Sequence, residues 1–587
     1  MDNIKSIFKS FMWSVKEISR HNKWIMWVLL VATLLSGLIP PATVLLTQEI
    51  VNSIQLHKTM NIILYLIISY LLLSFINDVT SSYINYYTTK SGLNFDLHIN
   101  KKILDKTEKL PLSSYENSET YNIINRAQSE SNGKILAYLK NVFSIFSNII
   151  STISFIIIII NLNAWLMVAI LIIPLIKFII INMINIEAFK IIKKRTNDSR
   201  KTWYVQFILT YGSFYKELKI YDLFNFFIDK YSTLQEKFNC QDIKLQKKQM
   251  IQLTAVTTIE TIIDGMILLF IISLGYSGKI LIGSVMTNIN AVSQIKTRIT
   301  SILQMISKLN QDSLFIDQLI LYLNLEEEEE DSKKIEINEI EQIEIKNLSF
   351  RYPDNEDLSL CNINLKMKKN DKIAIVGMNG SGKSTLIKII LGFYKDYSGE
   401  VLINNINLRD INKHSLLKNV SSVFQDYAKY EATFLENISY GDINKKVILD
   451  ELDEISHSFS LSKVINSSKD RYDTQIGNWF DNGIQISEGE WQKIALARAS
   501  FKDSSFYILD EPNASLDAIS DKKLSEMYKK MAQKNITIII AHKFSSFIKD
   551  VNQIVVLDKG KICGVGKHEE LFHSCPIYKK LYSLQVA

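Results

Sequence analysis

The stretch Gly377–Thr385, which reads GMNGSGKST, decides the fold of the second half of this chain. It fits the phosphate-binding pattern G-x-x-x-x-G-K-[ST], in which glycines let successive backbone N–H groups turn toward a phosphate. The apolar run Lys372–Val376 before it predicts a strand, and Ser384–Leu391 after it predicts a helix. Because the N-terminus of a helix favours negative charge, a loop in this context predicts nucleotide binding. The residues expected to contact the nucleotide are Gly377, Met378, Asn379, Gly380, Ser381, Gly382, Lys383, Ser384 and Thr385.

Polar side chains in and beyond this loop carry the expected chemistry. Lys383 is expected to reach the β- and γ-phosphates, and the hydroxyl of Ser384 suits Mg²⁺. Further along, Ser505–Glu511 reads SFYILDE and predicts a buried strand that ends in two carboxylates. Asp510 would hold Mg²⁺ through a water, and Glu511 would orient and deprotonate the attacking water. The two segments together predict nucleotide hydrolysis.

The composition indicates two unlike halves. A chain of 587 residues is too long for one ordinary domain. Its mean hydropathy of +0.06 is high for 22% charged residues, so one part must be very apolar. The formal net charge of +6 is modest, and Lys and Arg recur between apolar stretches rather than on one basic face. A nucleic-acid partner is therefore not expected.

The first half of the chain contains apolar stretches long enough to cross a bilayer. Each supplies about 20 residues of helix, which is the length needed for about 30 Å of hydrocarbon. The last stretch is the least apolar, because Lys296 and Arg298 interrupt it. The predicted spans are Trp24–Ile50, Ile62–Ile84, Val142–Ile160, Ala164–Ile186, Leu253–Tyr276 and Ile280–Ile306. We therefore expect a six-span α-helical membrane domain over residues 24–312.

The connections between these spans alternate between short and long. The long ones, residues 88–140 and 188–250, are rich in Lys and Arg, as is the N-terminal tail 1–23. By the positive-inside rule the tail, both long loops and the C-terminal half face the cytoplasm. Because the loops are expected to be helical, the spanning helices should continue well past the bilayer.

The composition and the hydrophobic pattern of the sequence change between the two halves. The acidic run Glu326–Asp331 lies between them, and such a run is either an interaction tail or a solvated linker. Its position favours a linker over residues 313–340. From 341 to 587, short β-rich runs alternate with helical patterns, which is typical of an α/β domain. The predicted strands are Ile343–Tyr352, Lys372–Val376, Val420–Phe424, Phe506–Leu509, Ile536–Ala541 and Gln553–Asp558.

Acidic residues also lie within or near the predicted spans. Glu260 and Asp264 are four residues apart on one helical face, and Asp78 lies near the end of the second span. Ionisable groups at membrane depth usually face a wet cavity or a partner, so these three are candidate substrate-cavity residues for a cationic cargo. The alternative is that they pair with basic residues of the spans (Lys177, Lys296 or Arg298) or lie where the helix has already left the bilayer.

With these motifs in order, the chain resembles the ATP-binding cassette (ABC) family over nearly its whole length. The resemblance implies that the nucleotide is ATP, with Mg²⁺ as cofactor, and that Tyr352 in SFRYP stacks on adenine. It implies that Gln425 in VFQD senses Mg²⁺ and faces the membrane domain. Ser515–Asp517 (SLD) resembles the D-loop, which places Asp517 at the nucleotide. His542 in IIAHK resembles the switch histidine that contacts the γ-phosphate.

The signature segment departs from the LSGGQ that is usual in the family. Ile486–Glu490 reads ISEGE, which keeps Ser487 and Gly489 as phosphate contacts but puts Glu488 in place of a glycine. If Glu488 points inward, repulsion between its carboxylate and the phosphate weakens ATP-driven closure; if it points to solvent, little changes. We expect active hydrolysis because the catalytic residues are present. They are Lys383, Glu511 and His542.

One cassette carries one phosphate loop and one signature segment, and in the family each ATP is clamped between the two types. A single chain is therefore expected to be a half-transporter, whose partner is a second copy of itself or a homologous half-transporter. The membrane half placed before the cassette resembles exporters, and Pro111–Ala127 and Tyr211–Tyr221 resemble their coupling loops. ATP binding would close the cassettes and favour an outward-open state, and hydrolysis would reset it.

Lys418–Asp442 and Asp473–Ala499 resemble exporters of lantibiotics and related ribosomal peptides. The resemblance implies ATP-driven export of a peptide across the plasma membrane of a bacterium, with peptide-modifying enzymes as further partners. No leader-cleaving protease is expected, because only a short tail without a Cys/His pair precedes the first span. The alternatives are a multidrug or lipid exporter of the same fold and a non-transporting regulatory or immunity module.

Overall fold

The computed structural model describes residues 2–586 apart from 118–119, 121–122, 125–126, 128–132, 161–163, 329–333, 354, 511–534, 542–547 and 549–550. Its contacts divide the chain into two compact units. We call them the helical unit (Met1–Leu110 and Asn117–Glu326) and the α/β unit (Pro111–Glu116 and Glu327–Ala587). The short segment Pro111–Glu116 therefore clusters with the second unit, although in sequence it lies within the first.

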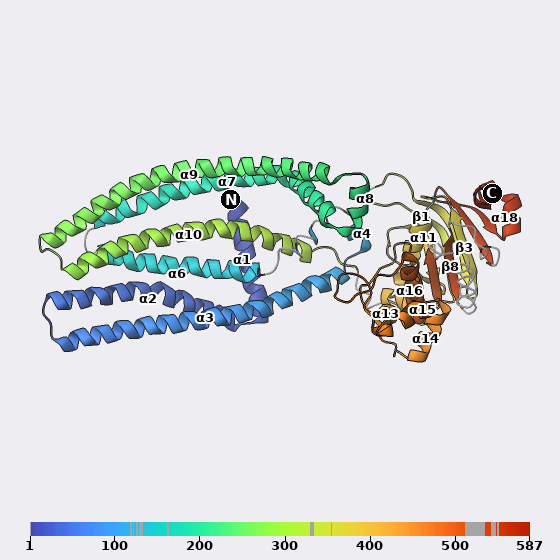
Figure 1. The fold of residues 1–587 in the computed structure, drawn as a ribbon, viewed down its shortest axis with the longest axis horizontal. Helices are drawn as coiled ribbons and strands as arrows, with labels where there is room; N and C mark the ends of the chain where they lie inside the picture. The colour runs from blue at the N-terminus through green and yellow to red at the C-terminus, as the bar shows by residue number, and fades with distance from the viewer. Residues whose placement is uncertain are drawn as a thin grey trace. The chain divides into compact units, whose positions relative to one another are not determined.

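The helical unit is built from long helices that lie side by side for much of their length (Figure 1). Its helices are α1 (Asp2–His21), α2 (Trp24–Gln55), α3 (Met60–Glu108), α6 (Lys134–Ile160), α7 (Ala164–Thr210), α8 (Tyr215–Ile220), α9 (Phe224–Tyr276) and α10 (Ile282–Leu323). Helices α3 and α9 have 49 and 53 residues. At 1.5 Å per residue each is about 75–80 Å long, which is more than twice the thickness of a bilayer's hydrocarbon core.

Among the described residues, five helices are long and apolar enough to cross a membrane by length and composition. They are Trp24–Gln55, Met60–Glu108, Lys134–Ile160, Ile170–Ala188 and Phe224–Tyr276. None of the residues in the apolar window of α3 is buried, as expected for a surface that lipid covers. The sixth predicted span lies in α10, which is not among these five and carries Lys296 and Arg298. Helix α10 also continues to Leu323, so it extends into the segment 313–340 where a linker was expected.

An apolar cluster holds α1, α3, α6 and α10 together. It is centred on large side chains with almost no exposure, among them Phe95 of α3, Tyr138 of α6 and Tyr322 of α10. The two tyrosine hydroxyls are satisfied inside the cluster, because Tyr138 donates to the carbonyl of Ile7 at 2.8 Å and Tyr322 donates to that of Ile103 at 2.9 Å. Each tyrosine therefore contributes apolar area without leaving a buried donor unpaired.

Two ion pairs connect helices of this unit at a similar depth. Lys177 of α7 pairs with Glu260 of α9, and Lys296 of α10 pairs with Asp264 of α9. Counted from the short-loop ends of their helices, all four residues lie about 18–24 Å along the helix axis, within the span of a bilayer. Both acidic residues of α9 thus have the basic partners that the alternative interpretation foresaw. Asp78 differs, because it is exposed on α3.

The described part of the α/β unit contains a four-stranded sheet in the order β2-β1-β4-β5 and a six-stranded sheet in the order β10-β9-β3-β8-β7-β6. The first sheet is formed by β1 (Gln342–Phe350), β2 (Leu360–Lys368), β4 (Ser398–Ile403) and β5 (Ile406–Asn407). The second is formed by β3 (Lys372–Gly377), β6 (Val420–Val423), β7 (Phe506–Asp510), β8 (Ile536–Ala541), β9 (Gln553–Asp558) and β10 (Lys561–Gly566). The first sheet is antiparallel, whereas β9, β3, β8, β7 and β6 pair in parallel and β10 is antiparallel to β9.

The six predicted strands are confirmed to within two residues at their ends. Strands β2, β4, β5 and β10 were not anticipated, because they are short or interrupted by polar residues. The helices of this unit are α4 (Leu112–Glu116), α11 (Lys383–Ile390), α12 (Lys413–Lys418), α13 (Phe434–Ser439), α14 (Leu449–Ser458), α15 (Ser462–Ser467), α16 (Glu488–Phe501), α18 (His568–Ser574) and α19 (Pro576–Val586).

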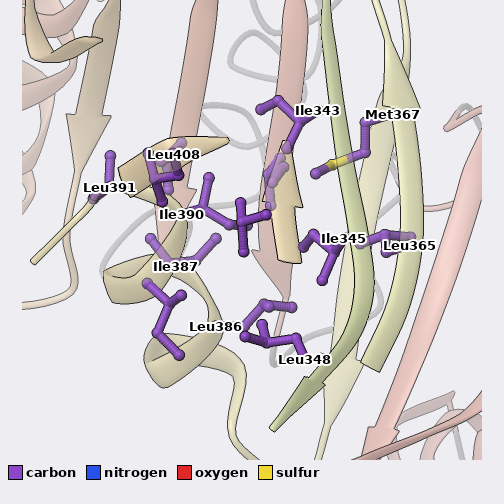
Figure 2. Close-up of a cluster of buried hydrophobic side chains, with 14 of the residues drawn as sticks. Ile343, Ile345, Leu348, Leu365, Met367, Leu386, Ile387, Ile390, Leu391 and Leu408 are labelled. Atoms are coloured by element: carbon purple, nitrogen blue, oxygen red, sulfur yellow. The ribbon is translucent and has the colours of Figure 1, made fainter. Parts of the chain in front are cut away.

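The helix that follows the phosphate-binding loop is anchored by its apolar face. Figure 2 shows Leu386, Ile387 and Ile390 of α11 lying toward Ile345 and Leu348 of β1. All five side chains are almost fully buried. Burying such a side chain contributes about 1.5–3 kcal/mol, so the start of α11 is held in place by packing and not by the loop itself.

Neutralising one member of the Lys177–Glu260 pair is expected to destabilise the helical unit. In Glu260→Gln the ammonium of Lys177 loses its partner at membrane depth, and breaking a partly buried pair there costs more than removing both charges. We expect Glu260→Gln to lower the apparent Tm of the detergent-solubilised protein by about 5 °C. Lys177→Gln/Glu260→Gln should recover most of that loss. Equal losses in the single and the double variant would show that the pairing is not what stabilises the unit.

Candidate nucleotide site

The phosphate-binding loop connects the end of β3 to the start of α11 and depends on its glycines. Gly380 and Gly382 have φ angles of +76° and +100°, which side-chain-bearing residues rarely adopt. A Cβ on Gly382 would also lie 2.8 Å from the carbonyl oxygen of Ser359. The backbone N–H of Gly560 donates to the carbonyl of Ser381 at 3.1 Å and fastens the loop to the turn between β9 and β10. The loop is thus fixed before any ligand binds.

A cavity of about 740 Å³ lies over this loop. It is lined by Tyr352, Asn355, Asp357, Leu358, Ser359, Asn379, Gly380, Ser381, Gly382, Lys383, Ser384, Thr385, Gln425, Asp510, Lys559 and Gly560. The structure therefore brings together loop residues, Tyr352, Gln425 and Asp510, which the sequence analysis assigned to one nucleotide site from separate motifs. Gly377 lies at the end of β3, where the loop begins.

The cavity also contains residues that the sequence analysis did not identify. They are Asn355, Asp357, Leu358, Ser359, Lys559 and Gly560. Lys559 and Gly560 have φ angles of +46° and +76° and form the tight turn between β9 and β10. The Lys-Gly pair predicts a turn, but nothing local indicates that this turn lies beside a loop almost 180 residues earlier.

The polar groups of the loop suit a phosphate. Lys383 is buried, and its ammonium donates to the carbonyl oxygens of Gly377 and Met378 at 2.9 and 3.0 Å, which curls the loop around a positive charge. The hydroxyl of Ser381 is buried and has no hydrogen-bond partner among the described residues. A buried hydroxyl without a partner costs free energy unless a ligand satisfies it. An anion in this loop would therefore gain both a charge partner and a donor.

Two further residues of the cavity come from the carboxyl ends of neighbouring parallel strands. Asp510 is the last residue of β7 and is buried, and Gln425 follows β6, which pairs with β7. Because parallel strands end at the same edge of a sheet, both side chains reach the same cavity as Ser384. A hydroxyl, an amide and a carboxylate offer the oxygen ligands that Mg²⁺ prefers, so the donor set fits this ion.

Tyr352, which follows β1, forms one wall of the cavity. Its ring packs edge-on against Phe350 and Tyr394, with ring centroids 5.1 and 5.4 Å apart. Its hydroxyl lies 3.1 Å from the hydroxyl oxygen of Thr385, the last residue of the loop motif. These contacts fix the ring beside the loop, in a position from which it can stack on a nucleotide base. Stacking on adenine stays a prediction.

The signature residues lie at the start of α16 and are not among the residues that line this cavity. Ser487 caps the helix: its hydroxyl oxygen accepts from the N–H of Glu490 at 3.3 Å, and the Glu490 carboxylate accepts from the N–H of Ser487 at 2.7 Å. Gly489 occupies the first turn. Glu488 forms an ion pair with Lys429 at 2.7 Å, and its side chain is 68% exposed in this chain. Whether it faces a phosphate bound by a second copy stays a prediction.

Three predicted site residues lie outside the described residues. They are Glu511, Asp517 and His542. Glu511 directly follows Asp510, and His542 directly follows β8, so the described chain ends beside both. Their roles stay predictions.

Comparisons with known proteins extend these observations to the whole chain. The model of the ABC transporter family matches residues 360–514. The chain is similar to the subtilin transport ATP-binding protein SpaT of Bacillus subtilis, with 34% identity over 552 residues, 94% of this chain and 90% of that protein. It is also similar to the nisin transport ATP-binding protein NisT of Lactococcus lactis subsp. lactis, with 33% identity over 559 residues, 94% of this chain and 92% of that protein.

A solved structure shows the same fold. A bacterial Atm1-family ABC exporter with ATP bound superposes with a TM-score of 0.78 at 20% identity, covering 95% of this chain and 98% of the other. The helical unit and the α/β unit are thus a membrane domain and an ATPase cassette. Together they define an ATP-hydrolysing membrane exporter.

The chain belongs to the ABC transporter family. It carries one membrane domain and one cassette, the arrangement of a half-exporter.

Removing the aromatic ring of Tyr352 is expected to weaken ATP binding. Stacking of a base on an aromatic side chain is worth about 1–3 kcal/mol, so Tyr352→Ala should raise the KM for ATP at least about fivefold. Tyr352→Phe keeps the ring and loses only the contact with Thr385, so its KM should rise less. Steady-state ATPase assays of the purified protein measure both. If both variants lose affinity equally, the hydroxyl and not the ring carries the effect.

Proposed function

We propose that this chain forms a homodimer in a bacterial plasma membrane and uses ATP hydrolysis to export a lantibiotic-like, ribosomally made peptide. The observation that carries the proposal is similarity along nearly the whole chain to two proteins whose names state transport of subtilin and of nisin. This similarity extends through the membrane domain, where an exporter contacts its cargo. Similarity confined to the cassette would support ATP hydrolysis without indicating a cargo.

We assign Mg²⁺ to Ser384, Gln425 and Asp510. The support is that these three side chains line one cavity with the phosphate-binding loop and supply oxygen ligands. A bound Mg²⁺ would neutralise charge on the phosphates. Lys383 would do the same, once a phosphate replaces its backbone acceptors.

The remaining roles follow from motif position. Glu511 is the proposed general base, and His542 is the proposed contact to the γ-phosphate. Asp517, Ser487 and Gly489 are proposed to serve a nucleotide across the dimer interface. Ser487 and Gly489 lie at the start of α16 and do not line the nucleotide cavity of their own chain. A helix start of this kind can bind a phosphate, which supports a contact with the ATP of a second copy.

The proposed orientation places the N-terminal tail, both long loops and the cassette in the cytoplasm. Support comes from the Lys- and Arg-rich character of the tail and of the loops. A cassette on the cytoplasmic side has access to the cell's ATP, and export then runs outward.

The first long loop supplies a physical contact for coupling. Helix α4 at its tip clusters with the cassette, where Leu112 packs against the hydrophobic core. The carboxylate of Glu116 accepts hydrogen bonds from Lys388 of α11 at 2.9 Å and from the hydroxyl of Tyr394. Burial acts to raise the pKa of Glu116, but the hydrogen bonds of Tyr394 and Lys388 and the charge of Lys388 outweigh it and lower this pKa. The carboxylate therefore stays ionised at neutral pH. Because Lys388 lies on the helix that follows the phosphate-binding loop, a movement of α11 on ATP binding would reach α4 directly.

Removing the Glu116 carboxylate is expected to uncouple export from hydrolysis. In Glu116→Ala, Lys388 and Tyr394 lose their shared acceptor, which loosens α4 on the cassette; none of these three residues lines the nucleotide cavity. We expect export per ATP hydrolysed to fall at least about fivefold, while the ATPase rate stays near that of the unaltered protein. Export and ATPase rates in proteoliposomes measure the ratio. The matched control is Glu108→Ala, because Glu108 is an exposed glutamate at the end of α3. An equal fall in export per ATP in this variant would contradict a specific role for Glu116.

Asp78, Glu260 and Asp264 remain our candidates for contact with a cationic cargo. Asp78 is exposed on α3, whereas the other two are held by Lys177 and Lys296. A cationic peptide would have to displace those lysines, so the pairs would open only when cargo is present. Unchanged export by Lys177→Gln/Glu260→Gln, at normal protein levels, would discard the cargo role of Glu260.

The cargo class is tested by stimulation of ATP hydrolysis. We expect a precursor peptide with its leader to raise the ATPase rate of the protein in nanodiscs by about twofold or more, since cargo binding lowers the cost of reaching the closed state. Glu511→Gln is the control for hydrolysis by contaminants. Stimulation by drugs or by lipids instead would assign the chain to a multidrug or lipid exporter. Absence of any ATP hydrolysis would favour a non-transporting regulatory or immunity module.

A further inference from the structure

The start of α16 carries more negative charge than a phosphate contact should tolerate. Glu488 and Glu490 both lie in its first turn. The carboxylate of Glu490 is occupied by the capping box, where it accepts from the N–H of Ser487 at 2.7 Å and from its hydroxyl at 2.9 Å. Glu488 stands where the family signature has a glycine, and its side chain is 68% exposed. Its charge would face any phosphate that a second copy brings to this helix start.

Lys429 supplies the counter-charge. Its ammonium lies 2.7 Å from the Glu488 carboxylate, and the hydroxyl of Tyr427 donates to the Glu488 carbonyl at 3.1 Å. Both residues belong to the segment between β6 and α13, which also contains Gln425 of the nucleotide cavity. The segment that contributes Gln425 to this chain's nucleotide site therefore also contributes Lys429, which neutralises Glu488 at the start of α16. That helix start would contact the ATP bound by a second copy.

The backbone on both sides of Lys429 is fixed, which distinguishes this pair from an ordinary surface ion pair. Arg498 of α16 donates to the carbonyl of Ala428 at 3.1 Å, and the buried side chain of Asn437 donates to that of Tyr430 at 2.8 Å. The Arg498 guanidinium also lies 4.5 Å from the centre of the Tyr430 ring. Ordering Lys429 therefore costs less entropy than holding a lysine on a mobile loop.

We propose that Lys429 is a positioning residue for ATP hydrolysis: its ion pair with Glu488 cancels the carboxylate charge at the signature helix, so that a second copy's ATP can be clamped there. This inference rests on the proposed dimeric ATPase and deepens it. It also explains how a signature segment with Glu488 in place of glycine supports closure.

The test uses the full-length protein and its steady-state ATPase. Lys429→Ala should raise the KM for ATP by up to about fivefold, the upper end of what an exposed ion pair contributes, with a smaller change in kcat. Lys429→Arg keeps the charge and should recover most of the affinity. In Lys429→Ala/Glu488→Gly the carboxylate is absent, so the KM should return to that of Glu488→Gly alone. The matched control is Lys369→Ala, because Lys369 pairs with Glu339 and is 41% exposed, against 42% for Lys429.

Salt separates an electrostatic role from a structural one. The defect of Lys429→Ala should shrink as ionic strength rises from 0.15 M to 1 M, since the screening length falls from about 8 Å to about 3 Å. An unchanged KM in Lys429→Ala, the same defect with and without Glu488, or an equal defect in Lys369→Ala would overturn the proposal. If the unaltered protein hydrolyses no ATP, the proposed function fails, and the pair is then tested by titrating the same variants with a fluorescent ATP analogue. In that titration, equal binding midpoints for Lys429→Ala and the unaltered protein would contradict the proposed role of Lys429.

Discussion

The close approach of Gly377 to the neighbouring strand is the constraint on which the nucleotide site depends. A Cβ at this position would overlap the carbonyl oxygen of Leu557 in β9. Because no side chain intervenes, β3 stays within the parallel sheet up to the residue where the phosphate-binding loop begins. On the other side of the loop, α11 is held through Leu386 and Ile390, which belong to the same hydrophobic cluster as Ile345 and Leu348 of β1. The polar chemistry of the loop therefore rests on close packing before and after it.

Ion pairs that neutralise acidic side chains occur in both units of the chain. At membrane depth Glu260 is paired with Lys177, since an isolated charge there is costly. In the cassette, Lys388 pairs with Glu116 of the first long loop, and Lys429 pairs with Glu488. These cassette pairs are partly exposed, so their net contribution to stability is small. The role that we propose for them depends on where they place a charge and on which segments they connect.

The sequence predicted the parts of this fold that depend on neighbouring residues. The phosphate-binding loop needs only nine contiguous positions, and strands such as Ile536–Ala541 are apolar along their whole length. Prediction failed where the signal is polar or shared between distant segments. Strand β2 carries Asn and Lys on its exposed face, which weakens its strand signal, and the turn at Lys559 has no motif that ties it to a nucleotide. The charged positions in α10 similarly make its apolar pattern the weakest of the predicted spans.

By itself, the sequence determined that the chain has an apolar helical half, a cassette with a phosphate-binding loop, and an altered signature segment. The helical half follows from local periodicity and the loop from the dihedral freedom of its glycines, whereas the cassette and its signature segment were implied by the resemblance to the family. Only the tertiary structure decided that Glu488 pairs with Lys429, 59 positions away, and that Glu116 contacts Lys388, 272 positions away. Such pairs depend on how the chain packs, because a charged side chain on a helix or loop carries no local signal of which distant residue will neutralise it.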